Sequence, residues 1–339
     1  MKKTAAFVFA VLMTLAGCFD HRPVLHVYTW ADYIAPEVAE AFEKEYGCRI
    51  VIDTFDSNEM LFAKLKSGSV GYDIVVPSSY VLPMFEHEDL LQKLDRSKIK
   101  TALANTDTNF ICKSEYAVHY TTSITGLSVR KTPETENLVP SWHMLTNSVF
   151  KGRVTLLNDV RETMGMALKT LGYSLNTVNP KEIAEAEALL IGWRKHIGKF
   201  ENEQYKSGIA SGEFNLVHGY SGDLWQVQDE HPSCVFIYPK EGYARTFDEL
   251  CVLKTAPNPD LAHRFIDFLF RPEQAAKNIE YIGYVMPCSA AYPLLPEKLR
   301  SNPVFFPPPE ILALGESIEY LGENLRLYTE AWDRVKSAN

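Results

Sequence analysis

Residues 27–80 read VYTWADYIAPEVAEAFEKEYGCRIVIDTFDSNEMLFAKLKSGSVGYDIVVPSSY, and their pattern predicts strand, helix, strand, helix and strand in that order. Val38 and Phe42 lie on one face of the first helix, which has Pro36 in its first turn and Gly47 after its last. Strands that alternate with helices predict a parallel sheet with right-handed crossovers. The segment therefore predicts an α/β fold.

Two loops of this segment follow strands, and ligands of parallel sheets bind beyond the carboxyl ends of the strands. The first loop places Asp32 between Trp30 and Tyr33, and the second places the hydroxyl of Ser78 beside Tyr80. Aromatic ring faces attract positive charge, and a carboxylate can pair with it. The two loops together suit an organic cation.

Local patterns also predict a helix cap, two further strands and a last helix. Asp56 is a candidate N-cap of the second helix, because Glu59 follows three residues later as in a capping box. We expect separate strands at 116–120 and 126–129 and a last helical segment over 310–336.

The chain begins like an exported protein. Lys2 and Lys3 precede an apolar run over residues 4–14 that is too short to span a bilayer. The following Leu-Ala-Gly-Cys, ending at Cys18, resembles a bacterial lipoprotein box, which implies that residues 1–17 are removed and that the Cys18 thiol is acylated. A plain signal peptide cut nearby, or an uncleaved anchor, is the alternative.

Length and charge narrow the function classes. The chain has 339 residues, enough for two lobes that each have a core. Its formal net charge is −9, which argues against nucleic acid as a partner and is compatible with a cationic ligand.

Five cysteines follow Cys18, and this odd number leaves at least one thiol unpaired within the chain. Cys234 and Cys251 flank a turn region and could face each other, whereas burial as small apolar side chains is the alternative for most of the five. The chain has no CxxC and no histidine pair at metal-ligand spacing, so we expect no metal site. The five are Cys48, Cys112, Cys234, Cys251 and Cys288.

Several acidic residues occupy later strand ends and helix starts. Asp159 and Glu162 stand at a strand-to-helix turn, where an acidic residue serves as a helix cap without any ligand. Asp223 also begins a helix, directly after a strand that ends in Tyr220. Asp248 lies within a strand-like run, so its carboxylate is either solvated or paired with a cation.

Taken in order, eight motifs resemble the solute-binding proteins of bacterial spermidine/putrescine import systems. The resemblance covers nearly all of the chain after residue 18. The motifs are WADYIAPEVAEAFEKEYG, DTFDSNEMLFAKLKSG, GYDIVVPSSY, NDVRETMGMALKTLGY, GYSGDLWQ, YPKEG, FIDFLFRP and IGY.

This resemblance implies a two-lobed, type II periplasmic-binding-protein fold with the ligand cleft between the lobes. Lobe 1 would comprise residues 24–121 and 248–292, and lobe 2 would comprise residues 122–247 and 293–339.

The resemblance also implies the ligand-binding residues. Aromatic walls would cover the methylenes of a polyamine, and carboxylates would pair with its ammonium groups, because an unpaired buried charge is very costly. The matching positions are Trp30, Asp32, Tyr33, Ser78, Tyr80, Asp159, Glu162, Tyr220, Asp223, Asp248 and Tyr284.

Some positions depart from the family pattern. Thr246 and Tyr220 each stand where the family has Trp, and Ile318 replaces a Gln that would reach an amine. Asp159 matches the spermidine-preferring branch and Asp223 matches the putrescine-preferring branch. The choice between the two polyamines therefore stays open.

The leading hypothesis is a non-catalytic, lipid-tethered monomer outside the cytoplasm, without a cofactor, that delivers putrescine or spermidine to an ABC permease. One alternative is the same fold with another small cation, an amino acid or a thiamine-like ligand; a sensory or adhesive role is another. A hydrolase using Asp159 and Glu162, or a Ser–His pair, lacks support, because the chain has neither a nucleophile elbow nor a phosphate loop.

Overall fold

A computed structural model describes residues 21–68 and 71–338. The expected signal peptide and the lipidation site at Cys18 lie outside these residues. Within the described ranges, no helix combines the length and the apolar character that crossing a bilayer requires.

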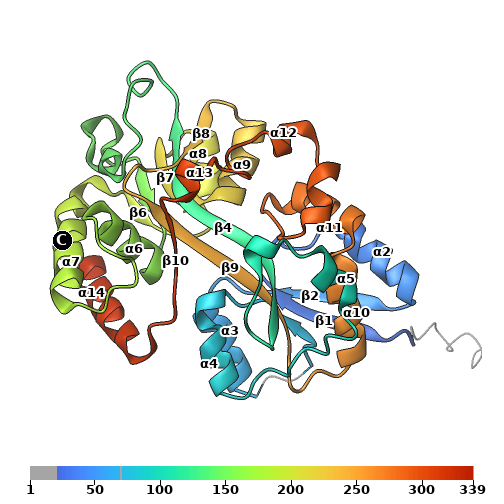
Figure 1. Cartoon of the computed structure of the whole chain (residues 1–339). Helices are drawn as coiled ribbons and strands as arrows, with labels where there is room; N and C mark the ends of the chain where they lie inside the picture. Colours follow the sequence, from blue (N-terminus) through green and yellow to red (C-terminus); the bar gives the residue numbers. More distant parts are fainter. Residues whose placement is uncertain (1–20, 69–70, 339) are drawn as a thin grey trace, which may run out of the picture.

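The first half of the molecule is built on the sheet that the opening segment predicts (Figure 1). Strand β1 (Val24–Thr29) pairs in parallel with β2 (Arg49–Thr54) and with β3 (Ile74–Val75), which confirms the predicted parallel direction. One face of β1 packs against α2 (Pro36–Tyr46), α10 (Pro259–Leu269) and α11 (Pro272–Ile282). The other face packs against α3 (Asn58–Lys66) and α4 (Leu82–His87).

Two long antiparallel strands, β4 (Ala117–Arg130) and β9 (Tyr243–Val252), connect this half to the other. The end of β9 pairs with β3, and the far end of β4 pairs with β7 (Leu216–Tyr220) and β8 (Cys234–Ile237). Figure 1 shows the two strands running side by side through the middle of the molecule. The prediction of two separate strands over 116–129 was wrong, because one strand continues across both halves.

The second half continues the sheet through β7, β5 (Val154–Leu156) and β6 (Lys199–Phe200). Its core lies between this sheet and three helices: α6 (Val160–Thr170), α7 (Pro180–Trp193) and α14 (Leu325–Ser337). Helices α8 (Tyr205–Ser211) and α9 (Ser221–Glu230) border β7. The expected helix over 310–336 is interrupted, because Gly315–Ser317 forms β10 beside β9 and only α13 (Pro309–Leu312) precedes it.

The remaining described elements are short. They are α5 (Lys100–Asn105), α12 (Glu297–Arg300), η1 (Ser79–Val81), η2 (Thr108–Phe110), η3 (Trp142–Thr146), η4 (Ser148–Phe150), η5 (Arg194–His196), η6 (Ser289–Leu294) and η7 (Gly322–Asn324).

Helix ends follow local chemistry, with one correction. Helix α3 is capped by Ser57, whose hydroxyl accepts a hydrogen bond from the amide of Met60, so the cap predicted at Asp56 was wrong. Asp159 caps α6 as the local interpretation expected, because its carboxylate accepts bonds from the amides of Arg161 and Glu162.

All five described cysteines are unpaired, and four of them are buried. Cys234 is the partner of Arg130 at one end of β4, whereas Cys251 is the partner of Ala117 at the other end. At about 3.3 Å per residue these ends lie roughly 40 Å apart along the strand. A disulfide between Cys234 and Cys251, one option left open by the sequence, is therefore excluded in this fold.

Gly126, in the middle of β4, leaves room for the neighbouring strand. A Cβ there would lie 2.6 Å from the ring of Phe236 and 2.9 Å from the carbonyl oxygen of Ile237. We expect Gly126→Ala to destabilise the protein by about 1–3 kcal/mol, as overpacking does. Gly192, in helix α7, has no atom within 4 Å of such a Cβ. Gly192→Ala should instead stabilise it by up to about 1 kcal/mol. Chemical denaturation would measure both, and equal effects would contradict the packing argument.

Candidate ligand-binding site

The floor of the site is a face of β4 and β9 that carries hydroxyl groups. Side chains alternate between the two faces of a strand, so Thr121, Ser123 and Thr125 share one face. Thr121 lies opposite Asp248, and Ser123 lies opposite Thr246. All five side chains are buried. The polar face thus runs across the junction of the two halves.

Asp248 stands at one end of this floor and is only 5% exposed. Its carboxylate accepts hydrogen bonds from the hydroxyls of Tyr33 at 2.5 Å, Ser78 at 2.8 Å and Thr121 at 3.2 Å. All the hydrogen-bonding partners that the described structure gives it are therefore neutral. Burial raises the pKa of Asp248 to about 6 in spite of these three bonds.

A second acidic group, Asp159 and Glu162, stands at the other end. Glu162 is 4% exposed and accepts hydrogen bonds from Thr125 at 2.8 Å and Thr246 at 3.5 Å. Burial, followed by the negative charge of Asp159, raises the pKa of Glu162 to about 8. Burial also raises the pKa of Asp159. The surroundings therefore disfavour the ionised form of both carboxyl groups until a positive charge is brought to them.

The positive charge of the neighbouring Arg161 lowers the pKa of both acids, but less than burial raises it, and its guanidinium has other hydrogen-bond partners. It donates hydrogen bonds to the carbonyl oxygens of Glu319 and Leu175 and to the side chain of Asn176. Its guanidinium is thus fixed by hydrogen bonds to two residues that precede α7 and to Glu319 near the C-terminus.

Four tyrosines surround the floor. The rings of Tyr33 and Tyr284 lie 5.7 Å apart between their centroids. Tyr80, from the first half, packs against Leu175, Ala244 and Ile318 of the second half, so the two halves are in contact here. Burial, followed by the charge of nearby acids, raises the pKa of each hydroxyl well above its usual range, so the hydroxyls stay protonated. The four are Tyr33, Tyr80, Tyr220 and Tyr284.

Asp223 lies beside this cluster and has its own partners. The hydroxyl of Tyr205 donates a hydrogen bond to it, and the ammonium nitrogen of Lys206 lies 3.6 Å away. The charges of Asp223 and Asp248 both contribute, after burial, to the raised pKa of Tyr284. Asp223 therefore has a basic side chain within ion-pair distance, whereas Arg161 acts on Asp159 only through its charge.

The two loop residues Asp32 and Trp30 differ from the others. Asp32 is exposed and has a φ of 55°, and no described side chain bonds to its carboxylate. Trp30 packs on Phe55 with ring centroids 4.4 Å apart, and its buried indole nitrogen has no described hydrogen-bond partner. The hydrogen bonds, ring contacts and charge interactions described in the preceding paragraphs therefore involve the other nine expected positions and neither of these two.

Three supporting residues escaped the sequence interpretation. Asn58 donates to the hydroxyls of Ser78 and Tyr80 and accepts from the Ser78 amide, so it fixes the second loop. Thr125 bonds to Glu162, and Tyr205 bonds to Asp223. The alternation of hydroxyl residues along 121–125 was the one sequence signal that could have revealed Thr125.

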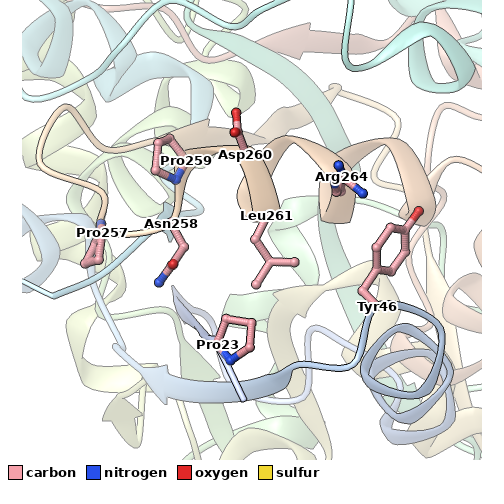
Figure 2. Close-up of a pocket in the computed structure, with 8 residues that line it drawn as sticks. All are labelled: Pro23, Tyr46, Pro257, Asn258, Pro259, Asp260, Leu261 and Arg264. Carbon is pink, nitrogen blue, oxygen red and sulfur yellow. The ribbon is translucent and has the colours of Figure 1, made fainter. Parts of the chain in front are cut away.

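A separate hollow of about 370 Å³ lies at the start of α10. Figure 2 shows its lining, in which Asp260 is the one carboxylate among the labelled residues. Asp260 is paired with Lys98 at 2.5 Å, and the guanidinium of Arg264 lies over the ring of Tyr46. This hollow suits a cation poorly, which leaves the buried acidic cluster as the candidate site.

Comparisons with known proteins agree with one another. A family model described as bacterial extracellular solute-binding protein matches residues 37–307. A putrescine/agmatine-binding protein of Pseudomonas aeruginosa is 32% identical, with 100% of both chains covered. The spermidine/putrescine-binding periplasmic protein of Escherichia coli is also 32% identical, over 98% of this chain and 97% of that one.

Solved structures extend the match to three dimensions. The spermidine/putrescine ABC transporter substrate-binding protein PotD of Streptococcus pneumoniae superposes with a TM-score of 0.82 at 30% identity. The match covers 93% of this chain and 98% of that one. The α/β periplasmic-binding-protein fold expected from the sequence is thereby confirmed.

Proposed function

Because this chain belongs to the bacterial extracellular solute-binding proteins, we propose that it captures a polyamine, putrescine or spermidine, and delivers it to an ABC permease. The resemblance found in the sequence is confirmed by these relatives. They are solute-binding transport proteins, which supports a receptor without catalytic activity.

The observation that carries the proposal is the pair of buried acidic groups at the two ends of one hydroxyl-bearing floor. Asp248 and Glu162 both have raised pKa values, because burial outweighs the hydrogen bonds to Asp248 and the charge of Arg161 near Glu162. A linear molecule with an ammonium group at each end would supply both charges at once. The tyrosine rings would cover its methylenes and attract its ammonium groups, by about 0.5–2 kcal/mol for each contact.

The two halves would act as lobes that close over the ligand. We assign residues 24–121 and 248–292 to one lobe and residues 122–247 and 293–339 to the other. Continuous strands at the crossing and the contact of Tyr80 with the opposite half support closure by a hinge. Small-angle scattering should show a smaller radius of gyration with the ligand than without it.

Calorimetry tests the central claim. The purified protein should first be unfolded and refolded to remove any ligand carried from the host. It should then be titrated separately with putrescine, cadaverine, spermidine and spermine. Saturable binding of one or two of these, recovered chemically unchanged, would support the receptor. A folded protein that binds none of them would refute the polyamine claim, and other small cations would be tested next.

The choice of distal anchor gives a sharper prediction. Lys206 lies 3.6 Å from Asp223 and already neutralises part of its charge, whereas Asp159 has no ion pair among the described salt bridges and feels Arg161 only through its charge. We expect Asp159→Asn to weaken polyamine binding at least about tenfold more than Asp223→Asn, a difference of about 1.4 kcal/mol. Calorimetry on the two variants measures this. The reverse order would assign the anchor to Asp223 and favour the shorter diamine.

The amino terminus would tether the receptor to a membrane as a monomer. We propose cleavage before Cys18 and lipid attachment to its thiol, on the basis of the Leu-Ala-Gly-Cys sequence. Cys18→Ala should release the protein from the membrane fraction without changing polyamine affinity. Membrane retention of this variant would refute the anchor.

A further inference from the structure

We propose that Cys112, His119 and Glu249 form a binding site for a thiophilic divalent metal ion, for which Zn²⁺ is the best match. Their potential ligand atoms all lie within 4.8 Å of one another. The three residues come from the connection before β4, from β4 and from β9, so the fold alone brings them together. This site is separate from the proposed polyamine site.

The main observation is an unsatisfied buried oxygen. Glu249 is 1% exposed, and its Oε1 lies 2.6 Å from Nδ1 of His119. Its other oxygen, Oε2, is buried and has no hydrogen bond of ordinary geometry, and the weakly donating thiol of Cys112 lies near this carboxylate. Leaving such a group unpaired costs about 1–3 kcal/mol, and more when it is charged. A metal ion coordinated by this carboxylate would remove the deficit.

The ligand types identify the class of metal. A thiolate, an imidazole and a carboxylate are ligands of Zn²⁺, which binds N and O at about 2.0–2.2 Å and S at about 2.3 Å. Tetrahedral coordination at those lengths separates the ligand atoms by roughly 3.3–3.8 Å. The observed separations therefore need only small side-chain movements. Hard cations such as Mg²⁺ and Ca²⁺ prefer sets made of oxygen alone, which the thiol of Cys112 does not fit.

The surroundings hold these ligands and leave access to them. The ring of Phe247 stacks on the imidazole of His119 at 4.4 Å with an interplanar angle of 20°, which fixes the ring. The side chain of His119 is 13% exposed and Cys112 is partly buried, so an ion can enter from their side. With three protein ligands, the fourth position of a tetrahedral ion is left for water.

A disulfide with the nearby Cys251 is the competing interpretation of Cys112. Both cysteines are free in the described structure, so the Cys112 sulfur is open to a metal.

The metal site and the polyamine site use opposite faces of β9. Asp248 and Glu249 are consecutive, and side chains alternate along a strand, so Asp248 faces the hydroxyl floor and Glu249 faces away. The two sites can therefore be occupied together. Variants of one face can be tested without removing ligands from the other.

Metal titration of the purified, chelator-treated protein tests the proposal. We expect one Zn²⁺ per chain, measured by competition with a chromophoric chelator, and a thiolate charge-transfer band when Co²⁺ is used as the probe. Changes beyond the direct ligands often cost 10–100-fold in metal affinity, so loss of a direct ligand should cost about 100-fold or more. We expect this loss for Cys112→Ser and for Glu249→Gln.

Matched variants separate this site from adventitious binding. Cys288→Ser removes another buried thiol, and Glu115→Gln removes an exposed carboxylate, and neither should change Zn²⁺ affinity. The thermal transition reports folding independently of any ligand; if Glu249→Gln fails to fold, the more exposed Cys112→Ser decides. Equal Zn²⁺ affinity in Cys112→Ser and the wild type, or a Co²⁺ spectrum without a thiolate band, would overturn the proposal.

Discussion

Asp248→Asn is expected to weaken polyamine binding by about a thousandfold. The substitution keeps the shape of the side chain and removes the negative charge that would pair with one ammonium group. An ion pair at 4 Å with an effective dielectric of about 20 is worth about 4 kcal/mol, which corresponds to nearly three powers of ten in the dissociation constant. The loss should be large because Asp248 is 5% exposed and solvent screens it little.

The measurement is calorimetry with the preferred polyamine, and Asp260→Asn is the matched control. Asp260 lines the hollow of about 370 Å³ at the start of α10, and its ion-pair partner is Lys98. Its variant should bind like the wild type. A wild-type affinity in Asp248→Asn together with a weakened Asp260→Asn would move the ligand to that hollow and refute the assignment of the floor.

Polyamine affinity should rise about a hundredfold between pH 6 and pH 8. The pKa of Glu162 without ligand is raised to about 8, so at pH 7 this carboxyl is mostly protonated. An ammonium group favours the ionised form, so binding releases the proton. Each pH unit below 8 then costs about 1.4 kcal/mol for one released proton. Below pH 6 the dependence should steepen, because the pKa of Asp248 is about 6.

Proton release can be measured directly. Binding heats recorded at pH 7 in two buffers with different ionisation enthalpies should show close to one proton released for each ligand bound. Glu162→Gln should abolish this release and flatten the dependence between pH 6 and pH 8. An unchanged proton release in that variant would transfer the titration to another group and contradict the raised pKa of Glu162.

The sequence predicted the elements whose signals are local. The first helix followed from Pro36, Gly47 and its apolar spacing, and the direction of β1–β3 followed from their alternation with helices. The prediction failed where pairing between strands that are distant in the sequence determines the secondary structure. Two strands were expected on either side of residues 121–125, although the pairing of these residues with β9 keeps β4 continuous. Gly315–Ser317 forms a strand because its residues pair with β9.

The loop residues of the site could be predicted from the sequence, whereas the residues that hold them in place could not. Ser78 and Tyr80 follow a strand of the sheet, and this position alone marks them as candidates. Asn58, which holds both, lies in a helix and gives no linear signal. The proposed metal ligands show the same limit, because His119 and Glu249 meet only through strand pairing and match no spacing motif.

The pairing of β3 with β9 has a consequence for the order in which the chain can fold. Ile74 pairs with Val252, so the sheet of the opening segment is continued by a strand that follows it by about half of the chain length. Long-range pairing of this kind slows folding, because loop closure must precede the contacts that reward it. Until β9 has been synthesised, β3 can pair with β1 but has no partner at its other edge. In a chain arranged in this way, the complete sheet can form only after the residues of β9 have been added.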